Sequence, residues 1–228
     1  MKILALDTAT EACSAALFVD GQVLERYRLA PREHTALILP MLDELLAESG
    51  FSIKEMDGLG FGRGPGAFTG VRIAAGVAQG IAFGVDLPVV PVSTLAALAL
   101  QVFDETALDY AFPCIDARMG EVYWGTFQRG RYNLPEPCQN ECVCPPESVT
   151  YPRAGAGVAL GSGWAGYGGL LQQSADGRVT AAWTDRYPRA GAVARLAADG
   201  FARGQQVQAD SALPVYLRDK VAKKPAHA

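Results

Sequence analysis

The chain has 228 residues, of which 50% are hydrophobic and 19% are charged, a composition typical of a globular protein with one or two hydrophobic cores. Its net charge of −4 and pI of about 5.2 argue against autonomous binding of nucleic acid, which depends on clustered Lys and Arg side chains that neutralise phosphates. One basic cluster lies near the end of the chain and is interpreted as a solvated tail: Arg218, Lys220, Lys223 and Lys224.

We expect neither a secretory signal nor a membrane span. Asp7 interrupts the short apolar run that follows Lys2, and the apolar helix expected at 70–84 is too short and too rich in glycine to cross a bilayer. The five cysteines are an odd number and are scattered, which is typical of a reduced protein. The sequence therefore predicts a cytoplasmic protein without membrane contact.

The first hundred residues predict an α/β lobe with a mixed sheet. Strands are expected at 2–8, 13–19 and 22–29, the last two joined by an Asp20-Gly21 hairpin turn. Apolar residues at helical spacing predict a helix over 35–48, bent at Pro40 and ended by Gly50. Further elements follow in order: a strand at 59–62, a helix at 70–84, a strand at 87–92, and a helix at 94–103 capped by Ser93.

The character of the sequence changes near residue 105, so we divide the chain into a first lobe, 1–105, and a second, 106–228, whose end packs back on the first. The second lobe predicts strands at 110–115 and 122–127, a proline-bearing loop at 133–146, and a strand at 155–163. A glycine-rich passage to Leu171 and a helix over 188–204 follow.

The segment Phe61–Gly84 organises the first lobe. It opens as a Gly/Pro turn, and Thr69 is the expected N-cap of the helix that follows. Three glycines recur on one helix face at i, i+4 and i+8, namely Gly76, Gly80 and Gly84, and each costs roughly 1 kcal/mol relative to alanine. Close approach of another backbone would offset that cost, and a helix apolar on both faces fits between two packed surfaces. A central core helix in a monomer is the alternative.

Catalytic motifs are scarce. The patterns GxxxxGK[ST], GxGxxG, HExxH, GxSxG and CxxC do not occur, and the only histidines are His34 and His227. The cluster Cys138-x3-Cys142-x-Cys144 lacks the fourth ligand that structural zinc requires. Asp116 and Arg118, at a turn, are interpreted as a local ion pair. Nothing nominates a nucleophile with a base.

Several motifs in order carry a family resemblance: ILALDTAT at 3–10, HTALILPMLDELL at 34–46, GRGPGAFTGVRIAAGVAQGIAFG at 62–84, PVSTLAALA at 91–99, DARMGEVY at 116–123 and PVYLRDKVA at 214–222. The chain resembles the bacterial TsaB (YeaZ) family from Lys2 to about Phe127 and again near its end.

This resemblance implies an actin/Hsp70/sugar-kinase-like fold of two related lobes, each with a mixed β-sheet flanked by helices. It also implies a role in forming N6-threonylcarbamoyladenosine at position 37 of tRNAs that read ANN codons. Members are similar in their first lobe to the transferase TsaD but are not thought to catalyse. They pair with TsaD through a helical bundle, support recruitment of the ATPase TsaE, and form homodimers when TsaD is absent. Contact with tRNA is then made only through the complex.

Two departures from TsaD-like sequences argue against chemistry in this chain. The segment 93–98 lacks the HxxxH pair that holds a metal in TsaD-like proteins, and hydrocarbon side chains cannot replace it. Ala9 stands where the superfamily's phosphate turn has a glycine that lets the backbone approach a phosphate.

The expected partner or dimer interface comprises Leu37, Met41, Leu45, Thr69, Gly70, Ile73, Gly76, Val77 and Gly80. A degenerate nucleotide-proximal set comprises Asp7, Thr8, Thr10, Arg63 and Arg72. We expect no catalytic residue, no metal and no tightly bound cofactor, with ATP or ADP left open at the surface shared with partners. The alternatives are a small-molecule kinase of the same superfamily, a metallopeptidase-like protein, and direct tRNA binding.

Overall fold

The first sheet is built from a three-stranded antiparallel unit extended by two parallel strands, in the order β3-β2-β1-β4-β5. Its strands are β1 (Lys2–Asp7), β2 (Ala12–Val19), β3 (Gln22–Leu29), β4 (Gly58–Gly62) and β5 (Val89–Val92). The β2–β3 turn has positive φ at both Asp20 and Gly21, as a two-residue hairpin with right-handed strand twist requires. The predicted hairpin is confirmed. The computed structural model describes residues 1–218, so Lys220, Lys223, Lys224 and His227 lie outside the described residues.

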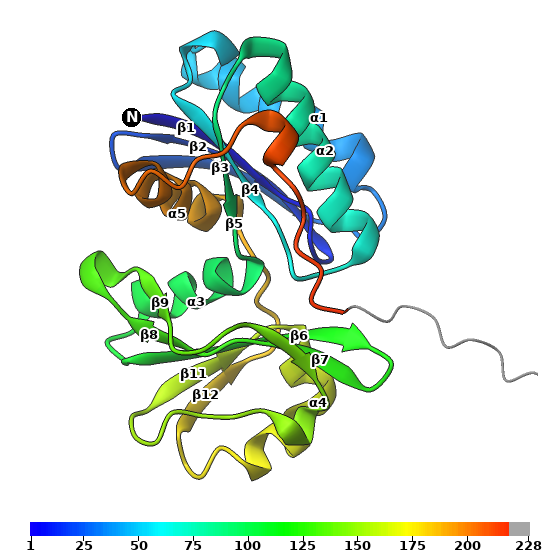
Figure 1. Ribbon diagram of the computed structural model, residues 1–228, viewed down its shortest axis with the longest axis vertical. Helices are drawn as coiled ribbons and strands as arrows, with labels where there is room; N and C mark the ends of the chain where they lie inside the picture. Colours follow the sequence, from blue (N-terminus) through cyan, green and yellow to red (C-terminus); the bar gives the residue numbers. More distant parts are fainter. Residues whose placement is uncertain (219–228) are drawn as a thin grey trace, which may run out of the picture.

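Helices cover both faces of the first sheet. On one face lie α1 (His34–Ser49) and α2 (Phe68–Val85), and on the other lies α5 (Ala190–Ala202) (Figure 1). Side chains alternate along β1: Leu4 and Leu6 join the core under α1 and α2, whereas Ile3 and Ala5 join the core under α5. The continuous apolar run of β1 thus fills two cores at once, one on each face of the sheet.

The second sheet has the order β10-β7-β6-β11-β12, with β8 paired to β6 and β9 paired to β8. Its strands are β6 (Tyr110–Arg118), β7 (Glu121–Trp124), β8 (Phe127–Arg129), β9 (Pro135–Pro137), β10 (Cys142–Cys144), β11 (Gly157–Leu160) and β12 (Val179–Trp183). One face packs on α3 (Thr94–Glu105), the other on α4 (Ser162–Gln173). Single 3-10 turns occur at Ile53–Glu55, Arg131–Asn133, Pro146–Ser148 and Ala209–Ser211.

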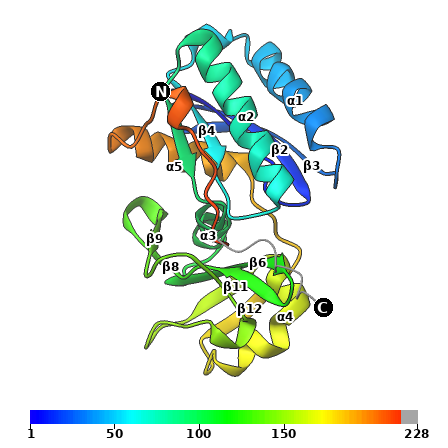
Figure 2. The ribbon, with the colours of Figure 1, turned by 45° about the vertical axis from the view of Figure 1, so that its right-hand side comes forward.

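Helices α3 and α5 contact each other between the two sheets, so the described chain is a stack of alternating helical and sheet layers (Figures 1 and 2). The two lobes, each a mixed sheet flanked by helices, confirm the expected fold class. The predicted cap of α3 is also confirmed, because the Ser93 hydroxyl accepts a hydrogen bond from the Ala96 amide at 3.1 Å.

The sequence assigned no secondary structure to the glycine-rich passage that ends at Leu171, and the structure shows that residues 162–173 form α4. Its glycines lower intrinsic helix propensity, but packing of Trp164 and Leu171 on the second sheet overrides it. The Trp164 indole N–H donates to the Phe112 carbonyl oxygen at 2.9 Å, which fixes the helix against β6. Strand β12 was not predicted, and the loop 133–146 contains the short strands β9 and β10.

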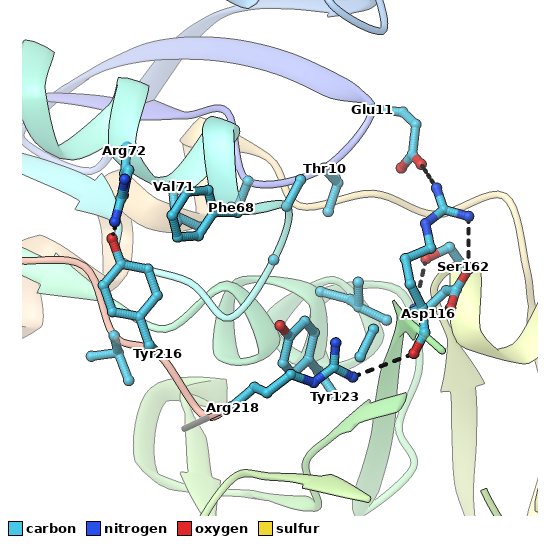
Figure 3. Close-up of a pocket in the computed structure, with 17 residues that line it drawn as sticks. Thr10, Glu11, Phe68, Val71, Arg72, Asp116, Tyr123, Ser162, Tyr216 and Arg218 are labelled. Atoms are coloured by element: carbon cyan, nitrogen blue, oxygen red, sulfur yellow. Dashed lines mark hydrogen bonds and ion pairs between the residues drawn. The ribbon is translucent and has the colours of Figure 1, made fainter. Parts of the chain in front are cut away.

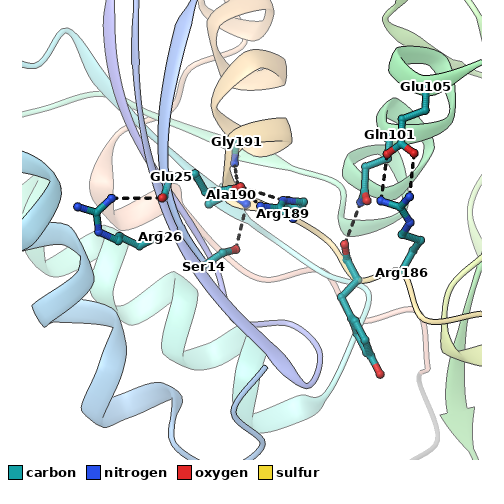
Figure 4. A network of polar contacts seen from close by, with 10 residues as sticks. Ser14, Glu25, Arg26, Gln101, Glu105, Arg186, Arg189, Ala190 and Gly191 are labelled. Carbon is teal, nitrogen blue, oxygen red and sulfur yellow. Dashed lines mark hydrogen bonds and ion pairs between the residues drawn. The ribbon is translucent and has the colours of Figure 1, made fainter. Parts of the chain in front are cut away.

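The chain returns from the second sheet to the first through residues 184–189, and polar contacts hold this crossing (Figure 4). Arg186 donates to both carboxylate oxygens of Glu105 at 3.0 and 2.8 Å, and Arg189 Nε donates to Glu25 at 2.8 Å. The same Glu25 carboxylate accepts from the Gly191 amide at 2.8 Å, in the first turn of α5. The helix therefore begins at Ala190, two residues after the Pro188 of the prediction.

Helix α2 is 18 residues long with a mean hydropathy of 1.3, so by length and composition alone it could cross a membrane. The sequence predicted a shorter helix, 70–84, and judged it too short, which is wrong because α2 extends at both ends. Ala74, Ala78 and Ala82 of α2 nevertheless belong to the core of the first lobe. The helix is therefore apolar on the side that covers the sheet, and its other side requires a separate explanation.

Candidate functional site

The loop after β1 holds the acid and hydroxyl residues that suggested a phosphate turn, and it is closed. Asp7 is 0% exposed, and its Oδ1 accepts from the Ala9 amide at 2.9 Å while Oδ2 has no hydrogen-bond partner. Burial raises the pKa of Asp7 to about 7, and the Ala9 hydrogen bond only partly offsets this effect. A carboxylate enclosed in this way is not available to a solvated cation or phosphate.

The start of α2 seals this loop. The Thr8 hydroxyl donates to the Gly70 carbonyl oxygen at 2.7 Å, and a Cβ added at Gly70 would lie 2.0 Å from the Thr8 carbonyl oxygen. Gly66 makes a similar approach, since its added Cβ would lie 2.3 Å from the Ala9 carbonyl oxygen. These glycines therefore serve contacts within the chain.

The prediction that Thr69 caps α2 is wrong. The helix begins at Phe68 with Ala67 in the cap position, and no side chain caps it. Contact with the loop after β1 sets where the helix begins. Thr69 therefore lies within the first turn and not at the cap position, and its side chain is exposed. Gly70 is buried by the same contact, so its expected place in a partner interface is also corrected.

A cleft of about 750 Å³ lies between the lobes (Figure 3). Arg118, from the β6–β7 turn, forms the predicted local ion pair with Asp116 at 3.0 Å and reaches Glu11 of the first lobe at 3.8 Å. The Asp116 amide donates to the Ser162 hydroxyl oxygen at 3.2 Å, which ties this wall of the cleft to α4. The cleft thus has a charged end where the two lobes meet.

The C-terminal part of the described chain forms another wall of the cleft. Arg72 Nε donates to the Tyr216 hydroxyl at 2.8 Å, and the Arg72 guanidinium lies 3.7 Å from the centre of the Phe68 ring (Figure 3). Arg218 binds Glu121 and donates to the Arg118 carbonyl oxygen at 3.3 Å. Residues 214–218 are therefore fastened to both lobes.

The structure separates the residues that were predicted to surround a nucleotide. Thr10 and Arg72 line the cleft, whereas Asp7 and Thr8 are completely buried beneath it. Arg63 lines a different cavity of about 570 Å³. These five residues do not form one site.

Sequence reasoning missed the polar contact in the cavity that Arg63 lines. The Ser93 hydroxyl, at the start of α3, donates a hydrogen bond to the Glu141 carboxylate, which comes from the irregular segment before β10. Burial raises the pKa of Glu141, while the Ser93 hydrogen bond and the Arg63 charge lower it. The sequence carried no signal for this pairing, because 48 positions separate the two residues. Within residues 1–218, no three His, Cys, Asp or Glu side chains are arranged to hold a metal ion.

The outer face of α2 is open. Among residues 1–218, no atom would lie within 4 Å of a Cβ added at Gly76, Gly80 or Gly84. Phe83, on the same side, is 87% exposed, and Ile73 and Val77 are only half-buried. The glycine face predicted from the sequence is therefore an exposed backbone surface on this chain.

A groove of about 650 Å³ runs between α1 and α2, and apolar side chains dominate its lining. It includes Leu39 and Leu46 of α1, Phe51 after it, and Gly80 and Gly84 of α2. Sequence reasoning missed Leu39 and Phe83. Phe83 shares a helical face with Gly76 and Gly80, which it assigned to the surface, whereas Leu39 lies on a different face of α1 from the residues assigned there.

Two residues of the expected interface belong to the core. Met41 is 7% exposed and Leu45 is 0% exposed, and both pack against the first sheet rather than pointing outward. Helix α1 has a broad apolar face, and the centre of that face packs against the first sheet. Leu37 is half-buried at the margin of the same core.

Comparison with known proteins gives close relatives over nearly the whole chain. The "tRNA threonylcarbamoyladenosine biosynthesis protein TsaB" of Escherichia coli (strain K12) is 43% identical over 98% of this chain and 97% of its own length. The chain belongs to the TsaB family. The Haemophilus influenzae protein of the same name is 40% identical over 97% of this chain and 95% of its own length.

A solved structure described as "YeaZ from Pseudomonas aeruginosa" is 44% identical, with a TM-score of 0.87 over 95% of this chain and 99% of that one. The sequence model described as "TsaD: tRNA N6-adenosine threonylcarbamoyltransferase" matches residues 27–162. The family resemblance read from the motifs is therefore confirmed.

The contrast between the inner and outer glycines of α2 is testable. Gly70→Ala should destabilise this TsaB-family chain by about 1–3 kcal/mol, because the new methyl group meets the Thr8 carbonyl oxygen. Gly76→Ala should stabilise it by about 0.5–1 kcal/mol, because the methyl group meets nothing and alanine favours the helix. Urea unfolding of both variants measures the difference, and equal effects would contradict the proposed seal.

The buried Asp7 carboxyl predicts a pH dependence of stability. Its pKa is raised from 3.8 to about 7 in the folded chain, so the folded state binds the proton more tightly and stability falls as pH rises from about 4 to about 7. In the Asp7→Asn variant, the decrease in the free energy of unfolding over this pH range should be smaller by up to about 4 kcal/mol. Unfolding in urea at pH 5 and pH 8 tests it, with the exposed Asp43→Asn as control. The same pH slope in wild type and Asp7→Asn would refute the assignment.

Proposed function

We propose that this chain is a non-catalytic, cytoplasmic partner that binds and activates a TsaD-type transferase, which forms N6-threonylcarbamoyladenosine at position 37 of tRNAs that read ANN codons. Two findings support this role. The TsaB relatives carry the name of that modification, and residues 27–162 match the TsaD model.

The observation that carries the proposal is the open glycine face of α2. Gly76, Gly80 and Gly84 each cost the helix about 1 kcal/mol relative to alanine. No atom of the described chain lies where their side chains would be, so no contact within the chain offsets that cost. Contact with a helix of another chain would offset it, because a surface without side chains lets two backbones approach closely.

The neighbouring apolar surface fits the same partner. Phe83 and Leu39 are exposed beside the glycine face, and the groove between α1 and α2 can take apolar side chains from a facing helix pair. A bundle of α1 and α2 with two partner helices would bury this surface. We propose that the partner is the TsaD-type protein and that a second copy of this chain occupies the face when TsaD is absent.

The closed loop after β1 supports a non-catalytic role. The Thr8 hydroxyl is already bound to Gly70, and Asp7 is enclosed, so neither faces the cleft where a superfamily kinase would hold phosphates. Thr10 and Arg72 do line the cleft, and we propose that ATP or ADP binds there only when TsaD-type and TsaE-type partners complete the surface. Contact with tRNA is assigned to the complex, in keeping with the net charge of −4.

Blocking the glycine face tests the proposed interface. Gly76→Leu and Gly80→Leu should each abolish association with the TsaD-type protein of the same organism, because the new side chain holds the two helices apart. The fold should survive, since both positions are open. Binding is measured by calorimetry, and activation by the yield of modified tRNA in a reconstituted reaction.

Gly166→Leu on α4 is the matched control, because Gly166 is an exposed helical glycine with no neighbour within 4 Å but lies on the second lobe. It should leave binding and activation unchanged. Undiminished binding by both α2 variants would show that TsaD does not use this face.

The kinase alternative makes a separate prediction. The isolated chain should show no tight binding of ATP with Mg²⁺ in calorimetry, because the loop that would hold the phosphates is sealed by α2. A dissociation constant in the micromolar range or below, about −8 kcal/mol, would reinstate the small-molecule kinase.

A further inference from the structure

Strand β10 places two thiols side by side at the edge of the second sheet. Cys142 and Cys144 are alternate residues of one strand, so their side chains leave the same face of the sheet. Two residues of strand advance about 6.6 Å, yet the two Sγ atoms are only 3.8 Å apart. Both side chains therefore turn toward each other, and the thiols make an S–H···S contact.

The pair is accessible. Within the described sheet, β10 pairs with β7 alone, where Cys142 lies opposite Trp124 and Cys144 opposite Val122. Both cysteines are partly exposed, whereas Cys13 and Cys114 are buried. Both side chains pack at the margin of the core that α4 covers and stay partly exposed there, so a small oxidant can approach them from the sheet edge.

The contact between the thiols makes them chemically unequal. The hydrogen bond between the two sulfurs lowers the pKa of Cys142 to about 7, while burial and Glu141 act in the opposite direction. The pKa of Cys144 is raised by this hydrogen bond, by burial, and by Cys114 and Glu121. At neutral pH the pair therefore offers one thiolate beside one thiol, which is the arrangement of an attacking and a resolving cysteine.

We propose that Cys142 and Cys144 form a reversible disulfide when the chain meets a hydroperoxide, which makes β10 an oxidation site. The Cys142 thiolate attacks the terminal peroxide oxygen and breaks the O–O bond, and in hydrogen peroxide the departing hydroxide takes a proton to become water. The Cys142 sulfenic acid is then attacked by Cys144. An S–S bond forms, the S–O bond breaks, and the hydroxyl leaves as a second water with the Cys144 proton. Two thiols and one hydrogen peroxide thus give one disulfide and two waters.

The short distance between the two sulfur atoms favours this bridge. Closure brings the sulfurs from 3.8 Å to about 2.05 Å, and the Cα separation of about 6.6 Å falls within the range that disulfides span. Same-face Cβ atoms two residues apart on an extended strand are also about 6.6 Å apart, beyond the roughly 3.5–4.5 Å that a disulfide allows. Closure therefore requires the three-residue edge strand β10 to leave its extended conformation. A bridge exposed at a sheet edge is one that dithiol reductants reopen.

The test uses the full-length chain and hydrogen peroxide, followed by removal of the excess peroxide and intact mass measurement without alkylation. We expect a loss of about 2 Da, from the two hydrogens of one disulfide, that dithiothreitol reverses. Cys138→Ser should behave like wild type, because Cys138 is an exposed thiol outside the pair. Cys142→Ser and Cys144→Ser should both lose the 2 Da shift.

The rate of alkylation gives a second readout. At pH 7, Cys142 should react with iodoacetamide about tenfold faster than a cysteine of ordinary pKa, because about half of it is thiolate. Circular dichroism before and after oxidation verifies that each variant is folded. The proposal is overturned if Cys142→Ser or Cys144→Ser keeps the 2 Da loss. It is also overturned if wild type gains oxygen atoms without first forming the bridge.

Discussion

The structure depends on the close contact between the start of α2 and the loop after β1. Gly70 lies against the carbonyl oxygen of Thr8, and Gly66 lies against that of Ala9. Both glycines are so close to these oxygens that a side chain would not fit. This contact fixes where α2 begins and how it is rotated over the first sheet. It buries Asp7 and at the same time turns Gly76 away from the sheet. One constraint therefore buries Asp7 and Thr8 in the loop after β1 and leaves the outer face of α2 exposed.

The buried loop after β1 and the exposed face of α2 together explain how a fold shared with kinases can serve a protein that we propose to be non-catalytic. The cleft between the lobes persists, with Glu11 and Arg118 at one end and Arg72 held by Tyr216 at another. Thr10 and Glu11 of the loop after β1 line the cleft, whereas Asp7 and Thr8 are buried beneath it. The surface free to interact lies instead on the outside of the first lobe, along α2.

Local signals in the sequence predicted much of this arrangement. The Asp20-Gly21 turn fixed the hairpin, the Ser93 hydroxyl marked the start of α3, and the spacing of Gly76 and its successors defined a face. Long-range contacts decided the rest. The sequence could not show that the first sheet takes Met41 and Leu45 from a broad apolar helix, or that Trp164 holds a glycine-rich segment helical.

The crossing at residues 184–189 has a mechanical consequence. Arg186 is hydrogen-bonded to the end of α3, and Arg189 is hydrogen-bonded to β3. The segment that contains Tyr216 connects α2 to the other lobe. Enzymes of two-lobed architecture commonly close around substrate by bending at such connections. Here polar contacts from both lobes brace the connections and oppose such bending. Resistance to bending would lower the entropy that the outer helices lose when another protein docks on them.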